Sequence, residues 1–186
     1  PHLVEEDYNL EDALVVAGFL QSFIRHADVV KIANIAQIVN VIAPVLTRGD
    51  EMLVQSIFHP FEMISKRRDG ISLRVVLDGP GYESPTHGGV GYVDSSAILD
   101  NRQLHVFLTN RSVDETAEVC VGVADAAIVS VEDAELLTAT GPKAANSFEN
   151  PEMVKPVACE TIRFDNGQAL VELPALTFAA LTVKLG

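Results

Sequence analysis

The chain has 186 residues, of which 48% are apolar, so it can bury a sizeable core in one or two domains. It carries 26 acidic residues and only 13 lysines and arginines, which gives a formal net charge of −13. Because this charge repels phosphate backbones and anionic lipid surfaces, the composition argues against nucleic acid or a membrane as a partner. The negative charge is more typical of a protein that uses it to stay soluble than of one that recognises a specific partner.

The two cysteines, Cys120 and Cys159, form neither a disulfide framework nor a CxxC motif. We interpret them as buried free thiols in a reducing cytoplasm. The acidic start, PHLVEEDYNLED, lacks the basic region of a signal peptide, and the run ALVVAGFL is too short to span a bilayer. The chain begins with Pro1 instead of Met, which indicates processing or a missing front part.

Asn9 and the acidic residues after it predict the start of a helix, because Asn caps free backbone N–H groups and acids suit the helix dipole there. Apolar residues then recur at helical spacing as far as Ile24 and cover most of the circumference. Such a helix is buried on more than one side. His26 is expected to cap its last turn.

The apolar run at residues 29–33 predicts a short buried strand of a parallel sheet, and residues 51–66 predict a second helix that Pro60 bends or restarts. Two helices and one strand cannot cover each other on every side, and a parallel strand needs neighbours. We therefore interpret residues 1–69 as the end of a larger α/β domain. We expect this part to pack on the remainder of the chain and to leave a large apolar face exposed.

From residue 70 the helical periodicity stops, and short strands alternate with turns such as DGPG, HGG and DNG. This spacing predicts an antiparallel β-sandwich over residues 70–186. The predicted strands are ISLRVVL, VGYVDSSAIL, QLHVFLTN, AEVCVGVA, AIVSVEDAELLTA, ETIRF, ALVELP and FAALTVKL.

Three amides, Asn34, Gln37 and Asn40, lie three residues apart inside the apolar stretch VVKIANIAQIVNVIAP. Buried amides cost free energy unless they are hydrogen-bonded. Nearby loop carbonyls would satisfy them in a purely structural role. The other possibility is that they face a ligand.

The segments NLEDALVVAGFLQSFIRHADVVKIANIAQIVNVIAPVLT, IFHPFEMISK and NSFENPEMVKPV resemble the C-terminal portion of a family 51 glycoside hydrolase, an α-L-arabinofuranosidase. The similarity extends over residues 10–185. It implies the end of a (β/α)8 TIM barrel followed by a C-terminal antiparallel β-sandwich of jelly-roll type. Residues 10–26 would be the seventh barrel helix, residues 29–33 the eighth strand and residues 51–66 the last barrel helix. A stretch that precedes the barrel in the family also contributes to the β domain, so one sheet edge is expected to be open here.

The resemblance also implies a role for the amides. Barrel active sites lie at the C-terminal ends of the strands, and Gln37 would be the glutamine that hydrogen-bonds the arabinofuranose next to the scissile bond. An amide can donate to one sugar hydroxyl and accept from another. Asn34 and Asn40 would hold the backbone behind it.

Members of the family are retaining enzymes that use two glutamates, on the fourth and seventh barrel strands. Neither motif is present in this chain, so we assign no catalytic residue and expect the chain alone to be inactive. The parent enzyme would remove terminal α-L-arabinofuranosyl groups from arabinan, arabinoxylan or their oligosaccharides. It would need no cofactor and would be a cytoplasmic homo-oligomer.

Other chemistries find little support. The five histidines show no HxH or HExxH spacing, and no serine stands in a GxSxG motif, so neither a metal site nor a serine hydrolase is expected. Tyr82 and Tyr92 flank a glycine-rich stretch. They could stack on sugar rings in a non-catalytic carbohydrate-binding or interaction sandwich, the alternative function. We favour packing inside the sandwich or against the barrel, because half-buried strands are rich in tyrosine.

Overall fold

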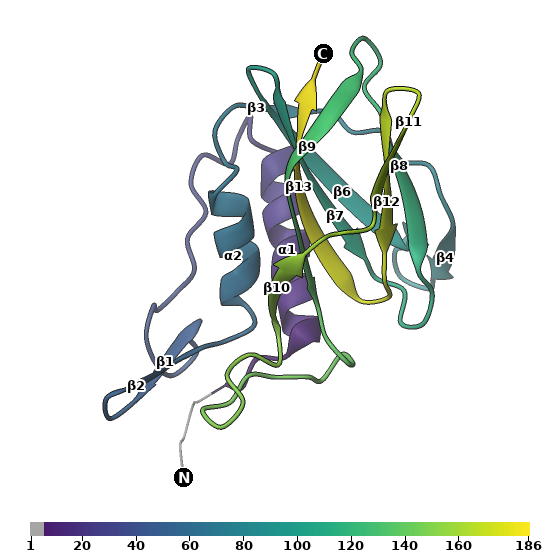
Figure 1. Ribbon diagram of the computed structural model, residues 1–186. Helices are drawn as coiled ribbons and strands as arrows, with labels where there is room; N and C mark the ends of the chain where they lie inside the picture. Colours follow the sequence, from purple (N-terminus) through teal and green to yellow (C-terminus); the bar gives the residue numbers. More distant parts are fainter. Residues whose placement is uncertain (1–5) are drawn as a thin grey trace.

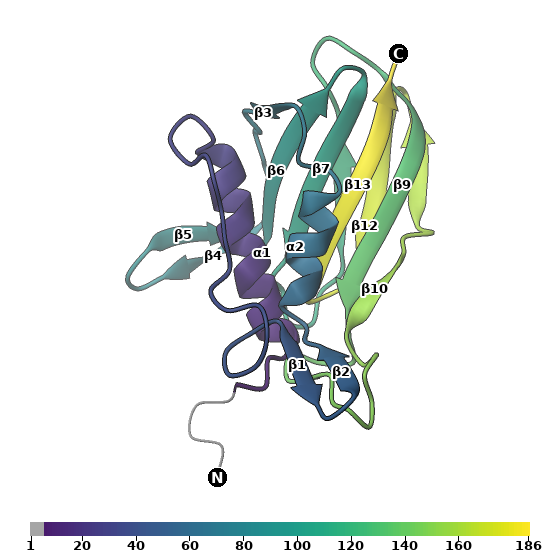
Figure 2. The same cartoon turned by 90° about the vertical axis from the view of Figure 1, so that its left-hand side faces the viewer.

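The computed structural model describes residues 6–186, which form three layers (Figure 1). Two helices, α1 (Leu10–Arg25) and α2 (Phe58–Ser65), cover one face of a large antiparallel sheet (Figure 2). A smaller sheet covers the opposite face. The chain is thus mostly β-sheet with few helices. No described helix is both long and apolar enough to cross a membrane.

The large sheet has six strands in the order β10-β9-β13-β7-β6-β3, and the small sheet has three in the order β11-β12-β8. Two hairpins, β1-β2 and β4-β5, stand apart from both sheets. The strand bounds are β1 Val45–Arg48, β2 Glu51–Val54, β3 Ile71–Leu73, β4 Gly81–Ser84, β5 Gly88–Gly91, β6 Val93–Asp100, β7 Gln103–Asn110, β8 Ala117–Val121, β9 Ile128–Thr138, β10 Lys155–Ala158, β11 Ile162–Asp165, β12 Gln168–Leu173 and β13 Thr177–Leu185.

Helix α1 begins as its sequence predicts. The Asn9 side chain accepts a hydrogen bond from the Asp12 amide (3.3 Å), and the Asp12 carboxylate accepts one from the Asn9 amide (2.9 Å). This reciprocal capping satisfies two N–H groups that lack helical partners. At the other end, Arg25 forms an ion pair with Asp94 on β6 (3.0 Å). The ring of His26 lies 2.8 Å from the Ser22 carbonyl, which confirms its predicted place at the helix end.

The central strands of the large sheet separate two apolar cores. Along β7, Leu104, Val106 and Leu108 point into the core between the two sheets, whereas Phe107 points toward the helices. Strand β13 divides its residues in the same way. Both strands are therefore buried on both faces, as the alternation in their sequences allows.

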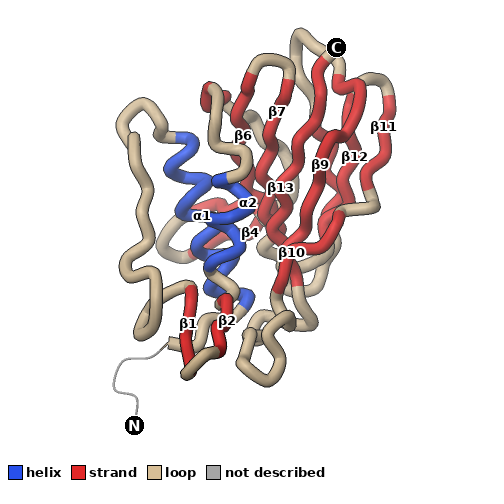
Figure 3. The backbone as a smooth tube through the Cα atoms, turned by 60° about the vertical axis from the view of Figure 1, so that its left-hand side comes forward, coloured by secondary structure: helices blue, strands red, loops and turns tan. Residues whose placement is uncertain are grey.

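The predicted strand at residues 29–33 is wrong. No strand forms there, and the side chains of Val29 and Ile32 are 71% and 77% exposed. A parallel strand is held by hydrogen bonds to neighbouring strands, and the described residues provide none beside this run. The run instead belongs to a long irregular connection between α1 and β1 (Figure 3).

The predicted helix at residues 51–66 is only half right. Residues 51–54 pair with β1 as strand β2, and helix α2 begins at Phe58. Pro60 lies in the first turn of α2, where its missing N–H leaves no helical hydrogen bond unmade. The proline thus marks a helix start instead of a bend in a longer helix.

The prediction that both free cysteines are buried is wrong for Cys120, because this cysteine is exposed on β8 while Cys159 is half-buried.

Strand β8 pairs only with β12 among residues 6–186. Its other edge is unpaired among these residues, as are the outer edges of β3, β10 and β11. Whether a preceding stretch pairs with one of them stays a prediction.

Candidate functional site

The connection between α1 and β1 contains the stretch that the sequence analysis singled out, and its two halves differ. Residues 29–39 are mostly exposed, including the large side chains of Val29, Ile32 and Ile38. From Asn40 onward the chain becomes half-buried and then buried at Ala43. The expectation that this apolar stretch is buried throughout is therefore wrong for its first half.

The second half is held by an unbroken series of hydrogen bonds, because every carbonyl from Asn40 to Val45 accepts one. Three of these bonds close the segment on itself and on the residue that follows β2: Ala43 N to Asn40 O (3.2 Å), Asn40 N to Val45 O (2.8 Å) and Gln55 N to Pro44 O (2.8 Å). The other three run from Glu6 N to Val41 O (3.1 Å), the Tyr8 hydroxyl to Ile42 O (3.0 Å) and the Gln55 side-chain amide to Ala43 O (2.8 Å). Irregular backbone with all its acceptors paired is fixed in one conformation.

The three amides have different surroundings. The Asn40 side chain accepts from the Thr47 amide (2.8 Å) and donates to the Thr47 hydroxyl (3.0 Å), so it fastens the connection to β1. Asn34 and Gln37 are exposed, and within residues 6–186 their side chains have no hydrogen-bond partner. Gln37 lies in the exposed half, three residues before the hydrogen-bonded half begins at Asn40.

The backbone here adopts conformations that L-residues rarely use. Gln37, Asn40 and Val41 have φ values of 52°, 61° and 64°. A β-branched residue such as valine is an outlier in this left-handed region. Such strain persists only where the surroundings impose it, and it gathers at functional sites.

Gln55 and Tyr8 are residues that sequence reasoning missed. Gln55 is 1% exposed and connects residues 6–8 with the fixed half of the connection. The only local signal was one amide inside the apolar run MLVQSIF. Nothing in the sequence indicated that its partners lie 47 residues away at Tyr8.

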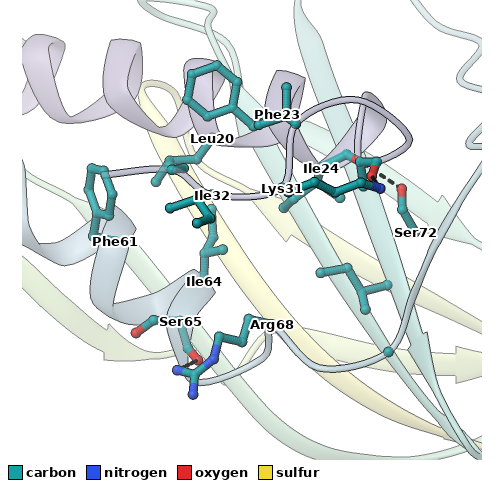
Figure 4. A pocket seen from close by; sticks show the side chains of 15 residues that line it. Leu20, Phe23, Ile24, Lys31, Ile32, Phe61, Ile64, Ser65, Arg68 and Ser72 are labelled. Carbon is teal, nitrogen blue, oxygen red and sulfur yellow. Dashed lines mark hydrogen bonds between the residues drawn. The ribbon is translucent and has the colours of Figure 1, made fainter. Parts of the chain in front are cut away.

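A second candidate is an apolar cavity of about 350 Å³ between the end of α1, helix α2 and residues 30–33. Ile32 of the connection faces this cavity together with Leu20 of α1 and Ile64 of α2 (Figure 4). Its lining includes the cations Lys31 and Arg68 but no carboxylate. It therefore holds no pair of groups for general acid–base chemistry.

The carboxylates elsewhere do not form a catalytic pair either. Hydrogen bonds from Arg48 and Lys155 lower the pKa of Glu149 and Glu152, and all four side chains lie on the surface. Residues 6–186 contain no group of three side chains placed to hold a metal ion. The strongest candidate in the described part of the chain is thus the hydrogen-bonded segment at residues 40–45, preceded by the exposed amide of Gln37.

Tyr82 and Tyr92 lie beside each other at hairpin β4-β5, with ring centres 5.5 Å apart. Tyr82 is 46% exposed and belongs to neither apolar core. Packing inside the sandwich is therefore wrong for Tyr82, whereas packing against the barrel, the other part of that expectation, stays a prediction. A short hairpin outside both sheets has no second layer to cover the ring.

Comparison with known proteins identifies the relatives of this chain. Residues 1–177 match the family described as the α-L-arabinofuranosidase C-terminal domain. The chain is 31% identical over 183 residues to an intracellular exo-α-(1→5)-L-arabinofuranosidase from Streptomyces lividans, covering 97% of this chain and 28% of the relative. It is 30% identical over 189 residues to an exo-α-(1→6)-L-arabinofuranosidase from Bifidobacterium longum, covering 99% and 36%.

Solved structures give the same result. A family 51 arabinofuranosidase from Xanthomonas axonopodis pv. citri superposes with a TM-score of 0.88 at 31% identity, over 97% of this chain and 37% of that one. A family 51 α-L-arabinofuranosidase from Bifidobacterium longum gives a TM-score of 0.90 at 25% identity, over 98% and 36%. The chain thus spans about a third of the length of the relatives it matches. It belongs to the family of α-L-arabinofuranosidase C-terminal domains.

Proposed function

We propose that this chain is the C-terminal part of a retaining exo-α-L-arabinofuranosidase that removes terminal α-L-arabinofuranosyl groups from arabinan, arabinoxylan or their oligosaccharides. The observation that carries this proposal is the family match over residues 1–177, together with relatives named as arabinofuranosidases. The parent would act inside the cell, as several relatives' names state, and would form a homo-oligomer.

Within this proposal, residues 1–69 are the end of the catalytic (β/α)8 barrel, and residues 70–186 are a jelly-roll sandwich that supports it. The unpaired run at residues 29–33 supports the first assignment, since an eighth barrel strand needs neighbours that the described residues lack. The exposed apolar side chains of α1 support it too, because a barrel helix packs against other helices.

Gln37 is the proposed contact to the arabinofuranosyl group. Its support is an exposed amide next to a strained backbone that is fixed on one side by hydrogen bonds. The free carbonyl and NH2 of this amide can each serve one sugar hydroxyl. Asn40 supports Gln37 by holding the backbone at Thr47, and Asn34 is the more remote of the three.

The first test is the intact mass of the native polypeptide in its source cells, followed by hydrolysis of 4-nitrophenyl α-L-arabinofuranoside. We expect a polypeptide much heavier than 186 residues that hydrolyses this substrate, and no activity for the 186-residue chain alone. In the heavier enzyme, Gln37→Ala should lower kcat/KM about tenfold or more, because it removes hydrogen bonds to the sugar. A native mass equal to that of this chain would overturn the assignment.

Exposed Tyr82 favours the alternative function, a non-catalytic carbohydrate-binding sandwich, because an exposed aromatic ring can stack on a sugar ring. Arabino-oligosaccharide binding to the 186-residue chain separates the two. Binding that is lost in Tyr82→Ala but retained in Gln37→Ala supports the binding module. Binding that is lost in Gln37→Ala but retained in Tyr82→Ala supports the arabinofuranosidase assignment.

A further inference from the structure

We propose that Gln55 is a positioning residue that fastens the backbone of residues 41–44 to that of residues 6–8 and thereby sets the direction in which Gln37 presents its amide. This inference rests on the proposed role of Gln37 in sugar binding. Gln55 itself is buried and does not contact the sugar.

The hydrogen bonds of Gln55 use the whole amide. Its Oε1 accepts from the Tyr8 amide (3.0 Å), and its Nε2 donates to the carbonyls of Glu6 (3.1 Å) and Ala43 (2.8 Å). Its backbone N–H donates to the carbonyl of Pro44 (2.8 Å). Both Nε2 hydrogens are thus used to join two irregular segments, neither of which has a sheet or helix of its own to hold it.

Residues 6–8 contribute contacts of their own to the same loop. The Glu6 amide donates to the Val41 carbonyl (3.1 Å), and the Tyr8 hydroxyl donates to the Ile42 carbonyl (3.0 Å). Burial and the nearby carboxylate of Glu6 raise the pKa of Tyr8, so its hydroxyl remains a donor. Gln55 therefore completes a set in which three successive carbonyls, at residues 41–43, are all held.

Backbone strain shows why this set matters for Gln37. Val41 has a φ of 64°, a conformation that costs a β-branched residue free energy and that a free loop would leave. If Val41 relaxed, Asn40 and the residues before it would turn with it. Gln37 is four positions upstream of Val41 and three residues before Asn40, where the hydrogen-bonded half of the connection begins.

The chain offers a matched control in Gln21, a second buried glutamine. Its Nε2 donates to the Thr109 hydroxyl (2.6 Å) between α1 and β7, which are two regular elements. Gln21→Met and Gln55→Met make the same chemical change at equally buried positions. Only the second lies at the loop.

The test compares amide hydrogen exchange and Gln37 side-chain NMR signals in the 186-residue chain and these two variants. In Gln55→Met we expect the Glu6 and Asn40 amides to exchange at least tenfold faster and the Gln37 side-chain signals to shift. Gln21→Met should leave both unchanged. Gln55→Glu retains the acceptor for the Tyr8 amide but loses both donors. Its amide exchange rates and Gln37 shifts should lie between those of the unmodified chain and those of Gln55→Met.

Unchanged exchange and unchanged Gln37 signals in Gln55→Met would overturn the proposal, and so would equal effects in Gln21→Met. If Gln55→Met does not fold, Tyr8→Phe replaces it. That variant removes only the hydrogen bond to Ile42 and should shift the same signals to a smaller extent.

Titration with methyl α-L-arabinofuranoside separates this inference from the proposed function. We expect the sugar to shift the Gln37 signals in the unmodified chain and in Gln21→Met, and the apparent Kd to rise at least tenfold in Gln55→Met. If the sugar does not affect Gln37 in the unmodified chain, its proposed role in binding fails. The exchange data would still decide whether Gln55 holds the loop.

Discussion

The two faces of the six-stranded sheet are packed in different ways. The face toward the three-stranded sheet contacts an apolar core of Leu, Val, Ile and Ala. The face toward the helices includes polar groups at its centre: Gln21 bonds Thr109, and the Thr182 hydroxyl lies 3.2 Å from Arg67 Nε and 2.9 Å from His105 Nδ1.

The two faces are therefore held together by different kinds of interaction. Apolar contacts are not directional, so the sandwich core fixes its sheets through shape and volume. Hydrogen bonds and ion pairs have preferred geometry, so those on the helical face fix how α1 and α2 lie on the sheet. Arg67 illustrates this, because it connects the end of α2 to Asp133 and Glu135 on β9 and to Thr182 on β13.

The largest loss of stability is expected from a substitution in the apolar core between the helices and the six-stranded sheet. Phe107 is fully buried and stacks on Phe178, with ring centres 6.5 Å apart. Phe107→Ala should lower the free energy of unfolding by about 3–5 kcal/mol, measured by urea denaturation. Leu181→Ala, in the core between the sheets, should cost about 2–5 kcal/mol in the same single transition. Separate transitions for the two layers would contradict a shared cooperative unit.

Replacement of Arg67 tests the polar part. Arg67→Met removes the partner at 2.9 Å from the partly buried Glu135 carboxylate and leaves it only Lys66 at 3.5 Å, so it should destabilise the chain by about 2–3 kcal/mol. Arg163→Met is the control, since the exposed pair of Arg163 with Glu118 is worth at most about 1 kcal/mol. Equal losses in the two variants would show that the buried position of Arg67 adds nothing.

A smaller effect is expected from acid. Burial lowers the pKa of both His59 and His105, and for His105 the charge of Arg67 lowers it further. Folding thus favours the neutral imidazoles, so their contribution is complete above the unfolded pKa of about 6.5 and is lost as the pH falls below it. The urea midpoint should decrease between pH 7 and pH 5.5, and His105→Gln should reduce that decrease. If the urea midpoint of His105→Gln decreased with pH as much as that of the unmodified chain, His105 would not contribute to the acid sensitivity.

The smallest effect on stability is expected on the outer surface of the helical layer. Val15, Phe19 and Phe23 follow one another at helical spacing on α1, and Phe19 is 60% exposed. Phe19→Glu should change the free energy of unfolding by no more than about 0.5 kcal/mol while it reduces self-association in sedimentation experiments. Val113→Glu, at an apolar site that is 72% exposed and lies outside the helical layer, is the control and should leave association unchanged.

Much of the sandwich was predictable because its signals are local. The alternation in QLHVFLTN matches β7 residue for residue, and FAALTVKL differs from β13 only by Thr177 at its start. The cap at Asn9 was predictable for the same reason, since its partner Asp12 is three residues away. Strand β10 was missed, because KPVA has a proline and too few residues to alternate.

The candidate site was predictable only in part. The resemblance pointed to Gln37 and Asn40, and the structure shows one amide exposed and the other bonded to Thr47, but the sugar contact of Gln37 remains a prediction. Gln55 and Tyr8 were beyond reach, because no periodicity links a loop residue to a partner in another loop.

The capped helix, the central strands and the family could thus be predicted from the sequence, since each depends on residues close together or on a long matching pattern. The state of residues 29–33 and the conformation around Gln37 depend on contacts between distant parts of the chain and became visible only in the folded structure. The run VVKIA has the composition of a buried strand, but a strand forms only where another strand offers hydrogen bonds. The strained backbone at Val41 likewise exists only because Glu6, Tyr8 and Gln55, distant in sequence, supply its neighbours with partners.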